Sequence, residues 1–179
     1  MTFTEYLKSI NACSDAIEWA ESKTVEEVVA TCHRGDWLLW LAYKCDIGLQ
    51  PLTLAKGHCA NTVRHLMNDD RSLKAVDTAI AFGEGRATRE ELDAAYAAAY
   101  AAAYAAVDAA AHAAADAAAA YAAAAAYAAD AAADAYYAAH AAADVAADAR
   151  DANRLQTADI CRQYIGDLII QKVNSILNP

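Results

Sequence analysis

Residues 94–149 lack glycine, proline, serine, lysine, arginine and glutamate, and they contain only alanine, tyrosine, aspartate, histidine and valine. Alanine fills 39 of these 56 positions. Because alanine is the best helix former and every strong helix breaker is missing, the segment is predicted to be helical. Few of its side chains can do chemistry, so it is unlike the wall of an ordinary enzyme pocket.

The chain is also short of basic residues. Lysine and arginine number 14 against 24 aspartates and glutamates, which gives a formal net charge of -10. This balance argues against a nucleic-acid surface, because such surfaces rest on clusters of lysine and arginine. A basic protein partner is compatible with it, since opposite charge promotes association.

Targeting, redox and catalytic signals are missing as well. The N-terminus has no basic region followed by an apolar run, and the longest charge-free alanine stretch, residues 94–107, is shorter than the roughly 20 apolar residues of a membrane span. The five cysteines are widely spaced and form no CxxC pair. There is no GxSxG, P-loop, GxGxxG or HExxH motif. We therefore expect a cytoplasmic protein with reduced thiols, no cofactor and no enzymatic activity.

Helical periodicity runs through the rest of the chain, and no segment of any length alternates like a β-strand. Helices are expected over residues 4–22, 24–32, 36–44, 52–67, 71–82 and 155–177. Thr24 with Glu27 and Thr88 with Glu91 have the spacing of capping boxes, and Asp36 is a candidate N-cap. The sequence predicts one all-α domain over residues 1–179, a helical bundle. Mixed-composition helices occupy residues 1–86, alanine-rich helices residues 88–150, and a final helix the C-terminus.

Marker residues recur along the alanine-rich segment, first at steps of four and then at mixed steps of three and four. One unbroken helix over this segment would be roughly 84 Å long. A hairpin of two long alanine- and tyrosine-rich helices, bent between Asp116 and Tyr127, is therefore favoured over one continuous helix. Alanine buries little area, so tyrosine rings are expected to supply packing. Exposed alanine faces would also favour a homo-oligomer.

The same segment contains candidate metal ligands. These are Asp108, His112, Asp116, His140 and Asp144. Side chains four residues apart share a helix face, and a hairpin would bring His112 and His140 to the same level. Imidazole and carboxylate groups bind divalent metals. The alternative is an exposed polar stripe on an alanine helix. A mixed cysteine and histidine zinc site elsewhere has no support from standard ligand spacing.

Basic and aromatic side chains concentrate in the first half of the chain, where they are candidates for a ligand or partner surface. The candidates are Arg34, Asp36, Trp37, Trp40, His58, Arg71, Glu84 and Arg86. Such a mixture suits either a protein interface or a small nucleotide-like ligand. Ordinary core packing of the two tryptophans is the alternative.

Several short stretches resemble a family of immunity proteins, the Imm-5-like family, over roughly residues 37–165. They are Cys59-Ala60, Asp70-Arg71-Ser72 before Lys74-Ala75-Val76, and Ala81-Phe82-Gly83-Glu84-Gly85, followed by the alanine-rich repeat. The repeat here carries tyrosine and aspartate where many family members carry arginine and tryptophan. The resemblance implies an all-α fold, a bacterial or phage context, and neutralisation of a toxin by binding without catalysis.

Three functions therefore compete. The first is a non-enzymatic inhibitor of the immunity type, which would bind a partner protein such as a basic toxin. The second is a phage-type anti-defence protein that sequesters a small nucleotide-like signal. The third is a metal-binding helical protein that uses the histidine and aspartate rows. An ice-binding role is disfavoured, because residues 94–149 contain no threonine.

Overall fold

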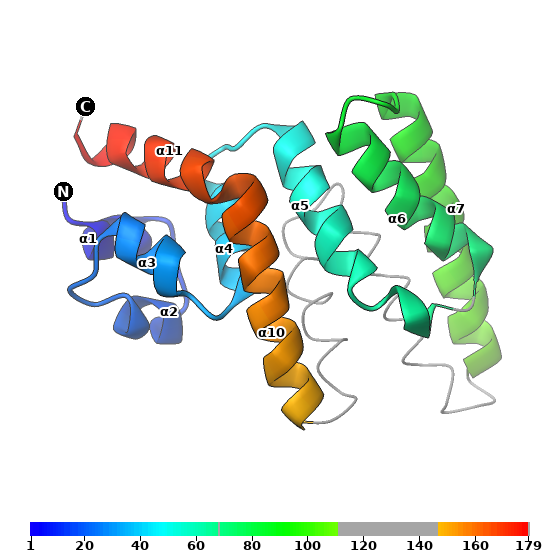
Figure 1. The fold of residues 1–179 in the computed structure, drawn as a ribbon, viewed down its shortest axis with the longest axis horizontal. Helices are drawn as coiled ribbons and strands as arrows, with labels where there is room; N and C mark the ends of the chain where they lie inside the picture. Colours follow the sequence, from blue (N-terminus) through cyan, green and yellow to red (C-terminus); the bar gives the residue numbers. More distant parts are fainter. Residues whose placement is uncertain (68, 111–146, 179) are drawn as a thin grey trace.

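The computed structural model describes residues 1–67, 69–110 and 147–178, and in these ranges the chain is all helical, without a β-strand (Figure 1). The all-α prediction is therefore confirmed. None of the helices in these ranges is both long and apolar enough to cross a lipid bilayer.

Short helices make up the N-terminal end, and longer ones make up the rest. The elements are α1 (Phe3–Ser9), α2 (Ser14–Trp19), α3 (Val25–Thr31), α4 (Gly35–Lys44), α5 (Leu49–Asn61), a 3-10 turn (Arg64–Leu66), α6 (Asp70–Gly83), α7 (Arg89–Ala110), α10 (Ala147–Cys161), a π-helical turn (Arg162–Gly166) and α11 (Asp167–Leu177).

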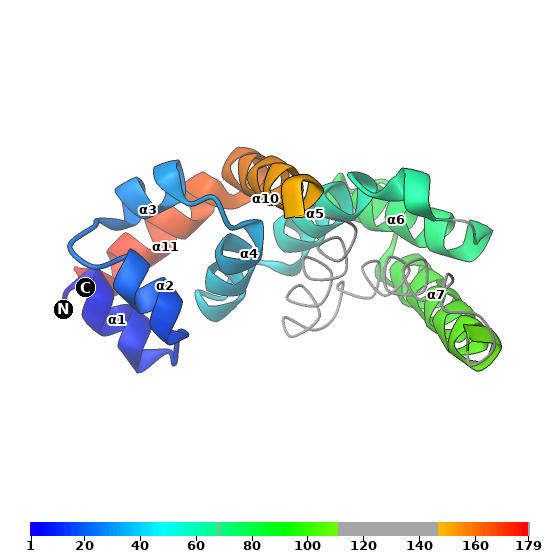
Figure 2. The same ribbon diagram turned by 90° about the horizontal axis from the view of Figure 1, so that it is seen from below.

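Neighbouring helices form a curved row. The antiparallel helices α5, α6 and α7 follow one another along the chain, and α10 packs on α4 and α5 at the near end of this row (Figure 1). At the π-helical turn the chain bends into α11, which returns over α1 and α3. Figure 2 shows the row as an arc with α1 and α2 at one end and α7 at the other.

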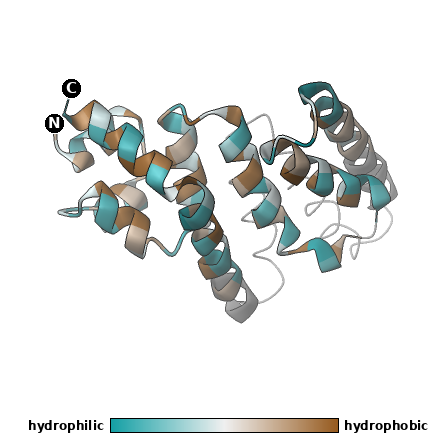
Figure 3. Ribbon diagram, turned by 45° about the horizontal axis from the view of Figure 1, so that its top comes forward, coloured by the Kyte–Doolittle hydropathy of each residue, from teal (hydrophilic) through white to brown (hydrophobic). Residues whose placement is uncertain are grey.

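Amphipathic helices explain this packing, and Figure 3 shows hydrophobic and hydrophilic residues alternating on the coloured helices, for example on α5 and α11. The larger core joins α1, α3, α4 and α5 to the C-terminal helices. Its fully buried members include Leu38, Ile165, Ile169 and Val173. A second core lies between α5, α6 and α7. Here Ala95 and Ala99 of α7 are buried against α6, while Tyr96 and Tyr100 are half-buried and stack on each other at 6.2 Å.

The expected helix over residues 4–22 is wrong, because the chain forms α1 and α2 with a break between them. Asn11 adopts a left-handed conformation with φ 60°, which a continuing helix does not allow. Asp36 is also not the N-cap of α4. That position belongs to Arg34, and Asp36 lies buried in the first turn. Both predicted capping boxes are confirmed by reciprocal bonds, from Thr24 to Glu27 and from Thr88 to Glu91.

The C-terminal helical segment reaches further back than the expected start at residue 155, because residues 147–154 are helical and include the end of the alanine-rich repeat. Helix α7 begins after Thr88, as predicted from its capping box. The choice between a hairpin and one continuous helix depends on residues 111–146, which lie outside the described residues.

Candidate functional site

The clearest candidate site is an apolar cavity of about 250 Å³ enclosed by α1, α2, α3 and α4. Its buried wall is formed by Phe3, Leu7, Val28, Leu38 and Leu41. Its half-buried or exposed lining residues are Asn11, Cys13, Ala16, Trp19, Trp37 and Trp40. Because the exposed lining comes from α2, its preceding loop and one side of α4, the cavity meets solvent there.

All three tryptophans of the chain line this cavity. The rings of Trp19 and Trp37 lie 6.0 Å apart at 58°, and His33 meets the Trp19 ring edge-on at 5.9 Å. Each indole also carries a cation of the chain near its face: Lys23 at Trp19, Arg34 at Trp37 and Lys44 at Trp40. Such contacts fix the ring orientations, which favours a preformed site.

One ion pair is built into the cavity wall. Arg34 donates two hydrogen bonds to Asp36, from Nε to Oδ1 at 2.8 Å and from Nη2 to Oδ2 at 2.5 Å. The Asp36 side chain is 4% exposed, and the Arg34 guanidinium compensates its buried charge. The same hydrogen bonds raise the pKa of the Arg34 guanidinium, which stays charged at any physiological pH. The pair supplies the cavity with a fixed carboxylate in otherwise apolar surroundings.

Two thiols also line the cavity, and they differ in exposure. Cys13 is exposed, whereas Cys32 is buried and donates from Sγ to the carbonyl oxygen of Arg34 at 3.4 Å. Burial raises the pKa of the Cys32 thiol, so the nucleophilic thiolate is disfavoured at neutral pH. Cys32 is therefore poorly suited to act as a nucleophile in this wall.

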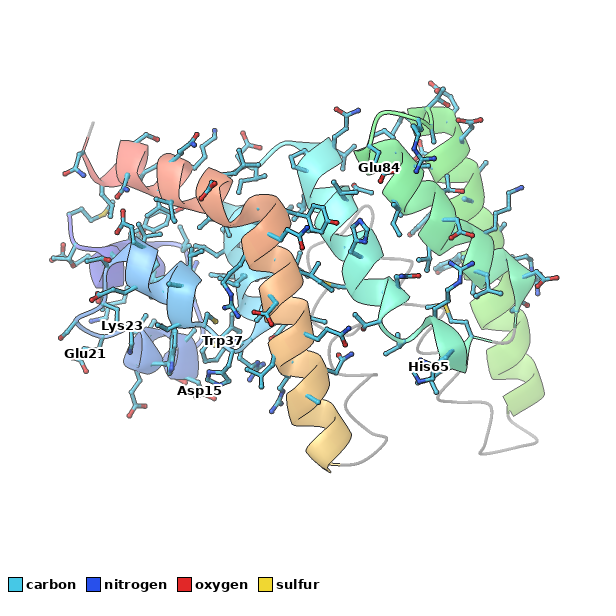
Figure 4. The ribbon with its side chains drawn as sticks, viewed as in Figure 1. Asp15, Glu21, Lys23, Trp37, His65 and Glu84 are labelled. Atoms are coloured by element: carbon cyan, nitrogen blue, oxygen red, sulfur yellow. The ribbon has the colours of Figure 1, made fainter. Side chains whose placement is uncertain are left out.

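Acidic side chains surround the N-terminal end. Residues 1–31 contain six carboxylates and two lysines. Asp15, Glu18 and Glu21 are exposed on α2 and just after it, on the helix that presents Trp19 to the cavity. Figure 4 shows Asp15, Glu21, Lys23 and Trp37 gathered at this end of the molecule. A partner that approaches the cavity from α2 therefore meets negative charge.

The remaining candidates for ligand or partner binding lie elsewhere. Arg71 and Arg86 both line a groove of about 570 Å³ between α6 and α7, with Arg71 at the start of α6 and Arg86 beyond its end. Lys74, Asp77 and Glu91 line the same groove. Arg71 is paired with Asp69, and Arg86 with Glu84. Figure 4 places Glu84 far from Trp37. Asp36, Trp37 and Trp40 thus line the cavity, and Arg71 and Arg86 line the groove. Arg34 and Glu84 belong to these sites only through their ion pairs with Asp36 and Arg86.

His58 packs flat on Tyr164 at 4.5 Å, across the contact between α5 and the π-helical turn. In the part of the chain that the structure describes, no three histidine, cysteine, aspartate or glutamate residues are grouped as metal ligands. The metal candidates His112, Asp116, His140 and Asp144 lie outside the described residues. Asp108 belongs to α7, but its side chain also lies outside them.

Sequence reasoning found Asp36, Trp37 and Trp40 but missed the other side of the cavity. Phe3, Leu7 and Val28 have the ordinary spacing of amphipathic helices, so nothing marked them as lining residues. The available signal was the confinement of all three tryptophans to residues 19–40. Large aromatic side chains concentrated in so short a stretch indicate either a core or a recognition surface.

Comparisons with protein-family models, with curated proteins and with solved structures find no match to this chain.

Proposed function

We propose that this chain is a non-enzymatic binding protein of the immunity type, which neutralises a partner protein by occupying its surface. The observation that carries the proposal is the tryptophan-lined cavity at an acidic end of the molecule. Protein interfaces concentrate their binding energy in a few aromatic and arginine side chains set in well-packed pockets. The sequence resemblance between Cys59 and Leu92 points to the same class of protein.

Charge and redox chemistry support the same proposal. A net charge of -10 favours a basic partner, since complementary charge accelerates association and selects against acidic proteins. The proposed site of action is the cytoplasm of a bacterium or of a phage-infected cell. Five unpaired cysteines suit that reducing compartment.

The test is capture of the partner from the cells that naturally produce the chain, followed by reconstitution with both purified proteins. The wild-type chain is compared with Trp37→Ala, which opens the cavity wall, and with Tyr43→Ala, which removes an exposed aromatic ring from the same helix α4. Circular dichroism melts confirm that each variant is folded.

The proposal predicts one protein bound at a fixed stoichiometry, inhibition of that protein's activity, and weaker binding by Trp37→Ala but not by Tyr43→Ala. Loss of a central interface tryptophan commonly weakens binding by a factor of about 30 or more, equivalent to about 2 kcal/mol. Native mass spectra that show only the bare chain or its own oligomer, from cells that contain every natural partner, would contradict the proposal.

A second candidate function is sequestration of a small nucleotide-like signal by an anti-defence protein of the phage type. The observation that favours it is the groove between α6 and α7, which Arg71, Lys74 and Arg86 line at different points along its length. Calorimetric titration with AMP and with inorganic phosphate tests it, because binding should require Lys74 and fall with added salt. An equal response from wild type and Lys74→Ala would remove this candidate.

The third candidate, a metal-binding protein, rests on the row of Asp108, His112, Asp116, His140 and Asp144. Elemental analysis of the purified chain tests it directly. Fewer than about one metal ion per several chains, in protein dialysed against a divalent metal before analysis, would end this hypothesis.

A further inference from the structure

We infer that the cavity receives one aromatic side chain of the partner, from a segment that also carries lysine or arginine. This inference rests on the proposed function and names the chemistry of the partner at the same site. The cavity volume, the one carboxylate in its wall and the charge around it each constrain the occupant.

Volume comes first. An apolar protein cavity of about 150 Å³ accepts a benzene molecule. The cavity between α1, α2, α3 and α4 measures about 250 Å³, which leaves room for a two-ring indole or for a phenol with its methylene link. A long aliphatic chain or a whole helix is too large. One anchoring side chain is the occupant that fits.

The carboxylate in the cavity wall favours aromatic rings that can donate a hydrogen bond. Asp36 lines the cavity, and each of its two oxygens accepts one hydrogen bond from Arg34. A carboxylate has about four lone-pair sites, so both oxygens can accept a further bond. An indole N–H or a phenol O–H that enters the cavity finds this acceptor, whereas a phenylalanine ring has nothing to donate. Tryptophan and tyrosine are therefore preferred.

Charge around the opening selects the neighbours of that ring. Three cations near the tryptophans already contact groups of this chain: Lys23 donates to the carbonyl oxygen of Trp19, Arg34 pairs with Asp36, and Lys44 lies 5.6 Å from the centre of the Trp40 ring. The exposed carboxylates Asp15, Glu18 and Glu21 remain on the side of α2. Lysine or arginine beside the anchor would meet them at close range, with an attraction that salt screens.

The experiment uses blocked tripeptides as probes of the full-length chain. The sequences are Lys-Trp-Lys, Glu-Trp-Glu and Lys-Ala-Lys, and free indole is the fourth probe. The tryptophan of each peptide is 5-fluorotryptophan, so that fluorine NMR follows the peptide without interference from the protein's own tryptophans, and proton NMR follows the other two probes. Titrations are carried out at low and at high salt.

Two pairs of variants test the location. Ala16→Phe places a ring in the opening from a half-buried lining position, and Ala30→Phe places the same ring on exposed α3 outside the cavity. Glu18→Gln together with Glu21→Gln removes charge beside the opening. As the control, Glu90→Gln removes one negative charge from the exposed first turn of α7, which lies far from the cavity along the arc of helices.

The expected result is binding of Lys-Trp-Lys at least about threefold tighter than Glu-Trp-Glu at low salt, with the difference shrinking at high salt. Lys-Ala-Lys should not bind. Ala16→Phe should abolish binding and Ala30→Phe should preserve it, while the paired glutamine variant should remove most of the preference for lysine.

Other outcomes overturn the inference. Indole that binds as tightly as Lys-Trp-Lys would make the cavity a small-molecule site. Self-association of the chain that Ala16→Phe abolishes would assign the cavity to a second copy. Peptide binding that Ala16→Phe leaves intact would place the peptide site outside the cavity. If none of the peptides bound, the inference would be wrong.

The two proposals fail in different ways. A captured partner that binds wild type and Ala16→Phe equally well would leave the immunity function standing and overturn only the assignment of the cavity. Peptide binding as expected, without any captured partner protein, would overturn the immunity function.

Discussion

Gly83 marks a close approach between the backbones of α5 and α6. A Cβ atom at this position would lie 2.7 Å from the Cα atom of Leu54 and 2.9 Å from its backbone nitrogen. Backbone atoms cannot move aside as a flexible side chain can, so the two helices would have to separate. The absence of a side chain at this residue therefore sets the spacing of the second core.

Gly83→Ala is expected to lower the free energy of unfolding by about 1–3 kcal/mol, the usual cost of overpacking. Gly48→Ala is the matched control, because its Cβ would have Pro51 Cδ as its nearest neighbour, at 3.9 Å. Because Gly48 is the N-cap of α5, where alanine is less favoured than glycine, that change should still cost no more than about 1 kcal/mol. Urea unfolding of both variants measures the difference. Equal stability of the two variants would contradict the close approach.

Ionisation of Tyr6 is expected to make the free energy of unfolding depend on pH in the alkaline range. Burial, and then its contact with Cys45, raise the pKa of this phenol well above its ordinary value of about 10. Below pH 10 both the folded and the unfolded chain hold the proton. Above it the unfolded chain releases the proton while the folded chain retains it, so stability falls as pH rises.

The Tyr6→Phe substitution should lower the free energy of unfolding at neutral pH, and this loss should disappear or change sign at alkaline pH. At pH 7 the variant loses the contact between the Tyr6 hydroxyl and Cys45 Sγ at 3.4 Å, which costs about 0.5–1.5 kcal/mol. At pH 11 the wild type alone is weakened by about 1.4 kcal/mol through ionisation of its unfolded state. The variant should then equal or exceed it. Urea unfolding at pH 7, 9, 10 and 11 measures the gap, and a gap independent of pH would contradict the argument.

Among the helices, α3 has side-chain hydrogen bonds to its backbone at both ends. Thr24 and Glu27 form the capping box at its start. At its end the carbonyl oxygens of Val29 and Cys32 accept hydrogen bonds from Arg162 Nη1, at 3.4 and 2.7 Å. A guanidinium at a helix C-terminus satisfies free carbonyls and interacts favourably with the helix dipole. The π-helical turn that contains Arg162 thus holds one wall of the cavity.

Arg162→Met should keep most of the packing of the side chain while removing these bonds, and should cost about 1–2 kcal/mol. The effect of Arg162→Met should also be local, because the backbone amides of α3 should exchange hydrogen faster than in the wild type. Arg86→Met is the control, because it removes an exposed arginine from the turn before α7. If both variants left exchange in α3 unchanged, the capping role of Arg162 would be wrong.

Sequence patterns predicted elements best where a local bond decides the boundary. The two capping boxes depend on side chains three residues apart, so Thr24 and Thr88 could be recognised directly. The break between α1 and α2 could not be recognised, because apolar spacing continues across Asn11. The expected start of the last helix at residue 155 was too late for a similar reason, since residues 147–154 are helical and carry no boundary signal in the sequence.

Only one side of the cavity could be predicted from the sequence, and the reason differs from the one that applies to helix boundaries. Asp36, Trp37 and Trp40 lie within five residues on one helix, so their spacing alone placed them together. The opposite wall comes from α1, α2 and α3, and only tertiary packing brings it there. Tertiary packing also separated Arg71 from Trp37, although both had the residue types of a binding surface.

At the scale of the whole molecule, the first and last helices pack on each other. Helix α11 contacts α1, α3 and α4, and Figure 1 shows both chain ends on the same side. Ile169 and Val173 of α11 are fully buried in the larger core, together with residues of α1 and α3. The N-terminal helices that form the cavity are therefore expected to unfold together with the C-terminal helix.

Ile169→Ala tests this coupling, because it removes a fully buried side chain more than 120 positions after the last tryptophan, Trp40. Such a truncation costs about 2–5 kcal/mol. Fluorescence of the three tryptophans reports only on the cavity end, while circular dichroism reports on all helices. If the molecule folds as one unit, both signals should shift to lower urea by the same amount. Ile176→Ala, at a position 37% exposed on the same helix, should shift them much less. A fluorescence midpoint that stays in place in Ile169→Ala would mean that α1, α2 and α3 fold without α11, and the cavity would then not depend on the C-terminal helix.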